Sequence, residues 1–240
     1  TIVTKKPNTT RNRIMGVLTE GNAQAIFLDT PGIQPTTDSL NKRLVETALK
    51  TISDVDLILF MVEAGQPLEE ADLMIAERVR SSRAPCLLII NKIDRVKKPS
   101  LLEEIGRLNA LGDFVHIIPI SALTGDGLNL LKKEIIKSLP YGQHYYPEDA
   151  VTDLPERFIV AEFIREEVIK HTHEEVPYAV AVEVEEFNEG EELVRIRARV
   201  HVERDSQKGI LIGKGGRMLK EIGTKSRESI EKLLGTKVYL

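Results

Sequence analysis

The sequence predicts an α/β domain with a mainly parallel sheet and flanking helices, followed by a smaller α+β domain. Over residues 1–139, short apolar runs rich in β-forming residues alternate with segments of helical spacing. Residues 140–153 then combine Pro, Gly and polar residues without periodicity, which is typical of a linker. Two long runs of alternating apolar and polar residues follow and indicate a β-hairpin. We therefore expect domains at 1–139 and 154–240, joined by a linker at 140–153.

In the first domain, strand-like and helix-like segments alternate along the chain. The expected strands are IMGVLTEG (14–21), QAIFLDT (24–30), DLILFMVEA (56–64), CLLIINKID (86–94) and HIIPISA (116–122). The expected helices are 39–52, 69–82, 100–111 and 127–139. This order predicts a parallel sheet with helices on both faces. Ligands of such sheets bind at the carboxyl ends of the strands, where polar residues follow the apolar runs here.

The second domain has a different order of elements, α-β-β-α-α-β. We expect a helix at 155–172, strands at 178–187 and 192–204, a short helix at 206–212, the loop GKGG at 213–216, a helix at 217–234 and a strand at 237–240.

Composition and charge narrow the possible function classes. The 240 residues are 42% hydrophobic, which suits one or two globular domains with their own cores. The net charge of −4 gives no global basic field, so any nucleic-acid surface must be local. The single cysteine, Cys86, lies in APCLLII and is expected to be buried in a reducing compartment, which excludes a disulfide or zinc framework. Apolar runs are shorter than a membrane span, and the cytoplasm is the expected location.

Two segments could hold a metal ion and a terminal phosphate. DTPG (29–32) places Asp29 at a strand end, where its carboxylate could support Mg²⁺ through water, and the Gly32 N–H could approach a phosphate closely. PNTTR (7–11) offers Thr10, or Thr9 in its place, as a metal ligand that could be released after hydrolysis. Each segment alone could also be an ordinary turn.

NKID (91–94) has the chemistry of a guanine site. The Asp94 carboxylate could accept two parallel hydrogen bonds from the N1–H and the exocyclic amine of guanine, whereas adenine has an acceptor at N1. Asn91 would brace the loop, and the Lys92 stem would cover the ring. In SAL (121–123), the backbone N–H of Ala122 could bind guanine O6.

Together these motifs give a set of candidate nucleotide-site residues. Thr10, Asp29 and Gly32 are the expected catalytic residues, and Thr10 and Asp29 the expected metal ligands. The expected nucleotide-binding residues are Asp29, Thr30, Pro31, Gly32, Ile33, Asn91, Lys92, Ile93, Asp94, Ser121 and Ala122.

The order and spacing of the motifs carry a family resemblance. Asp29 follows Thr10 by 19 residues, Asn91 follows Asp29 by 62, and Ser121 follows Asn91 by 30. With these motifs, the first domain resembles a P-loop GTPase domain of the Era-like, translation-factor-related class. The resemblance implies GTP and GDP as ligands, with Mg²⁺.

A P-loop, which the resemblance requires, is not found in this sequence. Its pattern is Gly, four residues, then Gly-Lys-Ser/Thr, and the nearest string, GILIGKGG (209–216), has the wrong spacing and lies far downstream. The strand before a P-loop occupies the middle of the parallel sheet, so without it the sheet would have a gap. We therefore expect roughly thirty further residues ahead of Thr1.

The GKGG loop suggests RNA binding. A G-x-x-G loop between two helices lets a nucleic-acid backbone approach, and the stretch 204–227 holds seven basic residues against two acidic ones. A solvated basic face on an ordinary helix connection is the alternative. With the element order, this domain resembles a type II KH domain. The candidate RNA-binding residues are Lys208, Gly213, Lys214, Gly215, Gly216, Arg217 and Lys220.

A GTPase domain followed by a KH domain resembles the Era family of bacterial GTPases over nearly the whole chain. Der-type GTPases differ, because they carry two tandem GTPase domains and a KH-like domain without the glycine loop. The resemblance implies a monomeric assembly factor of the 30S ribosomal subunit that binds 16S ribosomal RNA near its 3′ end. It also implies a short tail beyond Leu240, and peripheral association with the inner membrane, for which the sequence shows no signal.

Hydrolysis is expected to be slow. Ile33 follows DTPG, where Ras-like enzymes place a glutamine that orients the attacking water, so another group must assist, such as backbone, potassium or ribosomal RNA. Two alternatives stay open: an RNA-binding module whose GTPase-like domain cannot hold nucleotide, and a GTPase whose second domain docks protein.

Overall fold

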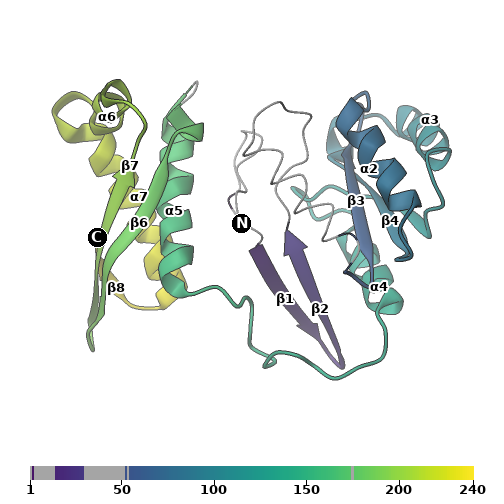
Figure 1. Cartoon of the computed structure of the whole chain (residues 1–240), viewed down its shortest axis with the longest axis horizontal. Coiled ribbons are helices and arrows are strands. Elements are labelled where there is room, and N and C mark those ends of the chain that lie inside the picture. Colours follow the sequence, from purple (N-terminus) through teal and green to yellow (C-terminus); the bar gives the residue numbers. More distant parts are fainter. Residues whose placement is uncertain (1, 3–13, 30–51, 53, 174–175) are drawn as a thin grey trace. The chain divides into compact units, whose positions relative to one another are not determined.

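The computed structural model describes residues 2, 14–29, 52, 54–173 and 176–240. The chain divides into two compact units, Met15–Thr152 and the unit that contains Asp153–Leu240 (Figure 1). The predicted α/β domain followed by a smaller α+β domain is confirmed. Residues 140–152 of the predicted linker belong to the first unit. The predicted domain limits at 1–139 and 154–240 stay a prediction.

The first unit alternates strands and helices as expected. Its elements are β1 (Ile14–Glu20), β2 (Ala23–Asp29), β3 (Ile58–Glu63), α2 (Glu70–Arg80), β4 (Cys86–Asn91), the 3₁₀ turn η1 (Ile93–Arg95), α3 (Lys98–Asn109), β5 (His116–Pro119) and α4 (Leu128–Ser138). The helix expected at 39–52 lies almost wholly outside the described residues.

A parallel sheet in the order β3-β4-β5 forms the centre of this unit. Residues 87–90 of β4 have no exposed surface, because hydrophobic clusters cover both faces of the strand. Leu88 and Ile90 face the cluster that contains Phe60 and Val79, whereas Leu87 and Ile89 face the one that contains Leu131. β1 and β2 form a separate two-stranded sheet, and among the described residues no strand pairs with both β2 and β3.

Residues 145–152 are bound to the β1–β2 sheet by hydrogen bonds. The Gln24 side chain of β2 accepts from the backbone N–H groups of Tyr145 (2.9 Å) and Tyr146 (3.0 Å) and donates to the Tyr146 carbonyl (2.9 Å). The Thr152 hydroxyl donates to the Met15 carbonyl at 2.6 Å. The end of the predicted linker is therefore attached to the two strands that precede DTPG.

Cys86 opens β4 and is 3% exposed, as expected of a small hydrophobe. Burial raises the pKa of its thiol to about 11, although a hydrogen bond with the backbone of Phe60 acts in the opposite direction. Since the thiolate is the reactive form, we expect iodoacetamide at pH 8 to modify the folded protein at least about tenfold more slowly than the protein in urea. Mass spectrometry of timed samples measures both rates, and equal rates would contradict the burial of this thiol.

The second unit has the expected order α-β-β-α-α-β. Its elements are α5 (Glu156–His171), the 3₁₀ turn η2 (Val176–Tyr178), β6 (Ala181–Glu189), β7 (Leu193–His201), α6 (Asp205–Ile212), the 3₁₀ turn η3 (Lys214–Gly216), α7 (Arg217–Leu234) and β8 (Lys237–Tyr239). β6 and β7 are antiparallel, and β8 pairs in parallel with β7. α5 and α7 pack together and contribute Val160, Ile164 and Ile230 to a core with Phe187 and Ile196 of the sheet (Figure 1). No helix of the described residues is long and apolar enough to span a bilayer.

Candidate nucleotide site and RNA-binding surface

Part of the predicted nucleotide site lies outside the described residues. This part contains Thr9, Thr10, Thr30, Pro31, Gly32 and Ile33. Their roles therefore stay predictions. Asp29 is the last residue of β2, at the carboxyl end of that strand, as the sequence predicts. Among the described residues no three His, Cys, Asp or Glu side chains cluster as a ready metal site.

The NKID and SAL loops are brought together by Asn91. β4 ends at this residue, and its side-chain oxygen accepts hydrogen bonds from the backbone N–H groups of Lys92 (2.8 Å) and Ala122 (3.0 Å). The Ile93 N–H also donates to the Ile120 carbonyl at 3.2 Å. Asn91 thus braces the loop, as the sequence suggests, and it does so by holding both motifs in one arrangement.

The strand expected to continue to residue 94 ends earlier, because Lys92 adopts a left-handed backbone conformation with φ 66°. This residue type rarely takes positive φ, so the conformation needs support from its surroundings. The turn lets Ile93, Asp94 and Arg95 form η1, which presents Asp94 on the surface next to the SAL loop.

Ser121 orients the Asp94 carboxylate. Its hydroxyl donates to Asp94 Oδ1 at 2.6 Å and accepts from the Thr124 N–H at 3.2 Å. Ser121 is 1% exposed, whereas Asp94 is exposed. A buried hydroxyl therefore fixes one oxygen of a carboxylate that solvent can reach. The arrangement can present an oriented, charged acceptor to a planar ligand that carries N–H groups.

Glu63 is a residue of this site that the sequence reasoning missed. It ends β3 and lies opposite Asn91 in the parallel register. Its carboxylate binds the Lys92 ammonium through Oε2 and the Arg95 guanidinium through Oε1, the latter at 3.2 Å. No local motif marks Glu63, and only the pairing of β3 with β4 could have indicated it.

The GKGG loop joins α6 to α7 with three glycines in conformations that other residues avoid. Gly213, Gly215 and Gly216 have φ values of 69°, 63° and 75°. A Cβ on Gly213 would lie 2.7 Å from Cβ of Met218, but Cβ atoms on Gly215 and Gly216 would meet no atom within 4 Å. The backbone of Gly215 and Gly216 is therefore open to a close approach from outside.

Four of the candidate RNA-binding cations are exposed on this loop and its two helices. They are Lys208, Lys214, Arg217 and Lys220. Within the described part of the chain, no ion pair joins any of them to an acid. Large apolar side chains lie on the same segments and are 40–49% exposed, namely Ile210, Ile212 and Leu219. Unpaired cations beside apolar surface suit phosphate and bases together.

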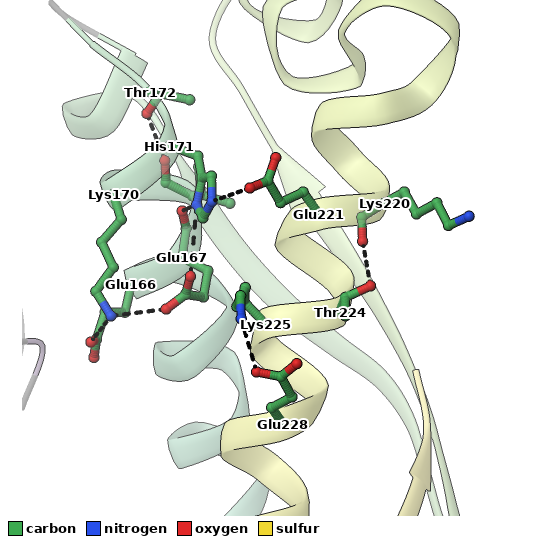
Figure 2. Close-up of polar contacts among 11 residues, drawn as sticks. Glu166, Glu167, Lys170, His171, Thr172, Lys220, Glu221, Thr224, Lys225 and Glu228 are labelled. Carbon is green, nitrogen blue, oxygen red and sulfur yellow. Dashed lines mark hydrogen bonds and ion pairs between the residues drawn. The ribbon is translucent and has the colours of Figure 1, made fainter.

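Other charges near α7 are balanced by neighbours (Figure 2). Lys225 pairs with Glu228 at 3.2 Å, and His171 of α5 lies 3.5 Å from the Glu221 carboxylate, while Lys220 extends away from both contacts. At the end of α5, burial acts to lower the pKa of Lys170, but its hydrogen bonds and charge interactions with Glu166 and Glu167 raise it overall. Lys170 and Lys225 are thus balanced by carboxylates, whereas no ion pair of the described residues includes the four cations around the glycine loop.

Family comparisons agree with both domains. Residues 1–92 match the family model described as 50S ribosome-binding GTPase, and residues 175–240 match that of the KH domain. GTPase Era of Syntrophus aciditrophicus (strain SB) is 49% identical over 241 residues, which cover 100% of this chain and 79% of that protein. GTPase Era of Geotalea uraniireducens (strain Rf4) is 52% identical over 240 residues, with 100% and 81% covered.

Solved Era structures have the same fold. Era in complex with MgGDPNP and nucleotides 1506–1542 of 16S ribosomal RNA superposes with a TM-score of 0.91 at 40% identity, over 100% of this chain and 82% of that one. A variant of Aquifex aeolicus Era bound to GDP and AlF₄⁻ gives 0.91 at 39% identity, with the same coverage. The motifs, the order of the domains and the full-length identity lead to one conclusion: this chain belongs to the GTPase Era family.

Proposed function

We propose that this protein is a GTP-binding and GTP-hydrolysing switch that binds 16S ribosomal RNA near its 3′ end and assists assembly of the 30S subunit. The observation that carries the proposal is the contact network of Asn91, Asp94 and Ser121, which joins two distant motifs around an oriented, exposed carboxylate. The protein acts in the cytoplasm as a monomer.

Guanine recognition follows from this network. Asp94 accepts from N1–H and the exocyclic amine, and the Lys92 stem lies over the ring. The Ala122 N–H, which donates to Asn91 at 3.0 Å, turns toward or is shared with guanine O6 when the base binds. Ile93 and Ser121 support the loop. The Ile93 N–H donates to the Ile120 carbonyl, and the Ser121 hydroxyl donates to the Asp94 carboxylate.

The phosphates and Mg²⁺ belong at the end of β2. Asp29 would support the metal through water, Thr10 would ligate it, and Gly32 would contact the terminal phosphate. Within the described residues, β2 pairs only with β1 and β3 only with β4, and Met61 of β3 is 51% exposed. Bound Mg²⁺ would neutralise charge that develops on the phosphates.

RNA binding is assigned to the GKGG loop. The open backbone at Gly215 and Gly216 allows a single strand to approach, and the cations Lys208, Lys214, Arg217 and Lys220 contact its phosphates. The Era structure with nucleotides 1506–1542 of 16S ribosomal RNA supports the choice of ligand.

GTP turnover and RNA binding test the proposal together. Because Ile33 cannot orient water, we expect the intact protein alone to hydrolyse GTP at a rate on the order of 10⁻³ s⁻¹ or slower. A labelled RNA equivalent to nucleotides 1506–1542 should bind, and binding should weaken steeply with salt. Released phosphate and fluorescence anisotropy are the measurements.

Three results would count against parts of the proposal. Fast turnover by the isolated protein would contradict the assignment of hydrolysis to an additional group. Absent GTP binding with intact RNA binding would favour the nucleotide-incompetent module. Absent RNA binding with normal GTP binding would favour a second domain that docks protein.

A further inference from the structure

We propose that Glu63 is a positioning residue for nucleotide binding, which holds Lys92 so that its stem lies over the purine ring. The proposal rests on the guanine site described above and adds a residue from a different strand to it. Glu63 ends β3, 28 positions before the first residue of NKID in the chain, and the parallel register places it opposite Asn91.

The contacts of Glu63 use both oxygens of its carboxylate. Oε2 binds the Lys92 ammonium, and Oε1 lies 3.2 Å from Nη1 of Arg95. Two cations from one turn therefore hold the carboxylate from both sides, and the side chain is only 32% exposed. The ammonium of Lys92 is tied at a fixed point, although the Lys92 side chain is itself 41% exposed.

Lys92 needs this restraint because a lysine stem has many rotamers. Its backbone is fixed at φ 66°, so the direction in which the side chain leaves the loop is set, but the four-carbon stem beyond is not. Immobilising such a side chain when a ligand binds lowers the affinity. A Glu63 carboxylate that already holds the ammonium reduces this loss before the base arrives. A half-exposed ion pair contributes little to folding, so its effect should appear in nucleotide affinity.

A double-mutant cycle between Glu63→Ala and Lys92→Met tests the proposal in the intact protein. GDP affinity is measured by fluorescence titration, and IDP, which lacks the exocyclic amine, is the second ligand. We expect Glu63→Ala to raise the Kd for GDP roughly three- to tenfold. In the Lys92→Met background the same change should have less than about a twofold effect, because the stem has lost its ammonium anchor.

The preference for GDP over IDP separates positioning of the stem from reading of the base edge. The stem covers a ring face that both bases share, so Glu63→Ala should weaken GDP and IDP equally, whereas Asp94→Asn should change their ratio. Glu63→Gln keeps one acceptor oxygen and should restore part of the affinity. Glu77→Ala, at an exposed position of α2, is the matched control and should leave both affinities unchanged.

The outcomes separate the role of Glu63 from the existence of the guanine site. An equal Glu63→Ala effect in both backgrounds, or no effect while Lys92→Met weakens binding, overturns the role of Glu63 and leaves the guanine site in place. Unchanged affinity in Lys92→Met and Asp94→Asn overturns the guanine site itself. Thermal unfolding of each variant shows whether it folds, and Glu63→Gln replaces Glu63→Ala if the alanine variant does not.

Discussion

Replacing Asp94 by asparagine is expected to shift the base preference of the protein from guanine to xanthine. The carboxylate would accept two charge-assisted hydrogen bonds from guanine, worth roughly 1.5–3 kcal/mol each, so the Kd for GTP should rise at least about a hundredfold. An asparagine can instead donate to the O2 carbonyl of xanthine. Competition of GTP and XTP for a fluorescent nucleotide measures the change.

The control for this substitution is Asp113→Asn, since Asp113 is also exposed, belongs to the same unit and lies outside the NKID and SAL loops. It should leave both affinities unchanged. Ser121 can still donate to the side-chain oxygen of the new asparagine, so the loop should keep its shape. Native GTP affinity in Asp94→Asn would remove NKID from the nucleotide site.

Replacing both Gly215 and Gly216 by aspartate should abolish single-stranded RNA binding and leave GTP binding intact. Both glycines have positive φ, so each aspartate costs roughly 1–2 kcal/mol of backbone strain, but the new Cβ atoms meet no neighbour. The fold should therefore survive, while two carboxylates repel the phosphates at the point of closest approach. Anisotropy of the labelled RNA and nucleotide titration measure the two affinities.

Gly21→Asp supplies the matched control. Gly21 has φ +57°, its added Cβ would also meet nothing within 4 Å, and it lies in the first unit. It imposes the strain and charge of one such substitution on a turn outside the proposed RNA-binding surface, so RNA affinity should stay at the native value. If the double variant still binds the RNA, the glycine loop is not the clamp.

Much of the fold was predictable because apolar periodicity reports burial directly. The run CLLII predicts a strand covered on both faces, and residues 87–90 of β4 are fully buried. Departures from this pattern arise from backbone geometry. β4 ends before residue 94 because of the left-handed Lys92, and β6 begins late because Val176–Tyr178 form a 3₁₀ turn. The register shift between Val184 and Glu186 coincides with the doublet Glu185-Glu186, where the alternation breaks and the apolar positions pass from Val182 and Val184 to Phe187.

The candidate site was predictable as a set of motifs but not as a set of contacts. Spacing alone indicates that Asp94 and Ser121 share a site, since both follow parallel strands. That Ser121 binds Asp94, or that Asn91 holds the Ala122 N–H, depends on loop conformations fixed by the whole unit. The role of Glu63 could not be predicted from any motif, because it depends on the register of β3 against β4.

The attachment of residues 145–152 to the β1–β2 sheet sets the length of the tether between the two units. Thr152 is bound to Met15 and α5 begins at Glu156, so only residues 153–155 separate the two anchored points. The four Cα–Cα steps from Thr152 to Glu156 extend at most about 14 Å. A tether this short gives each unit a high effective concentration near ligands of the other, in the millimolar range typical of short linkers. A ligand held by one unit is therefore confined near the other, and each inserted residue should lower this effective concentration.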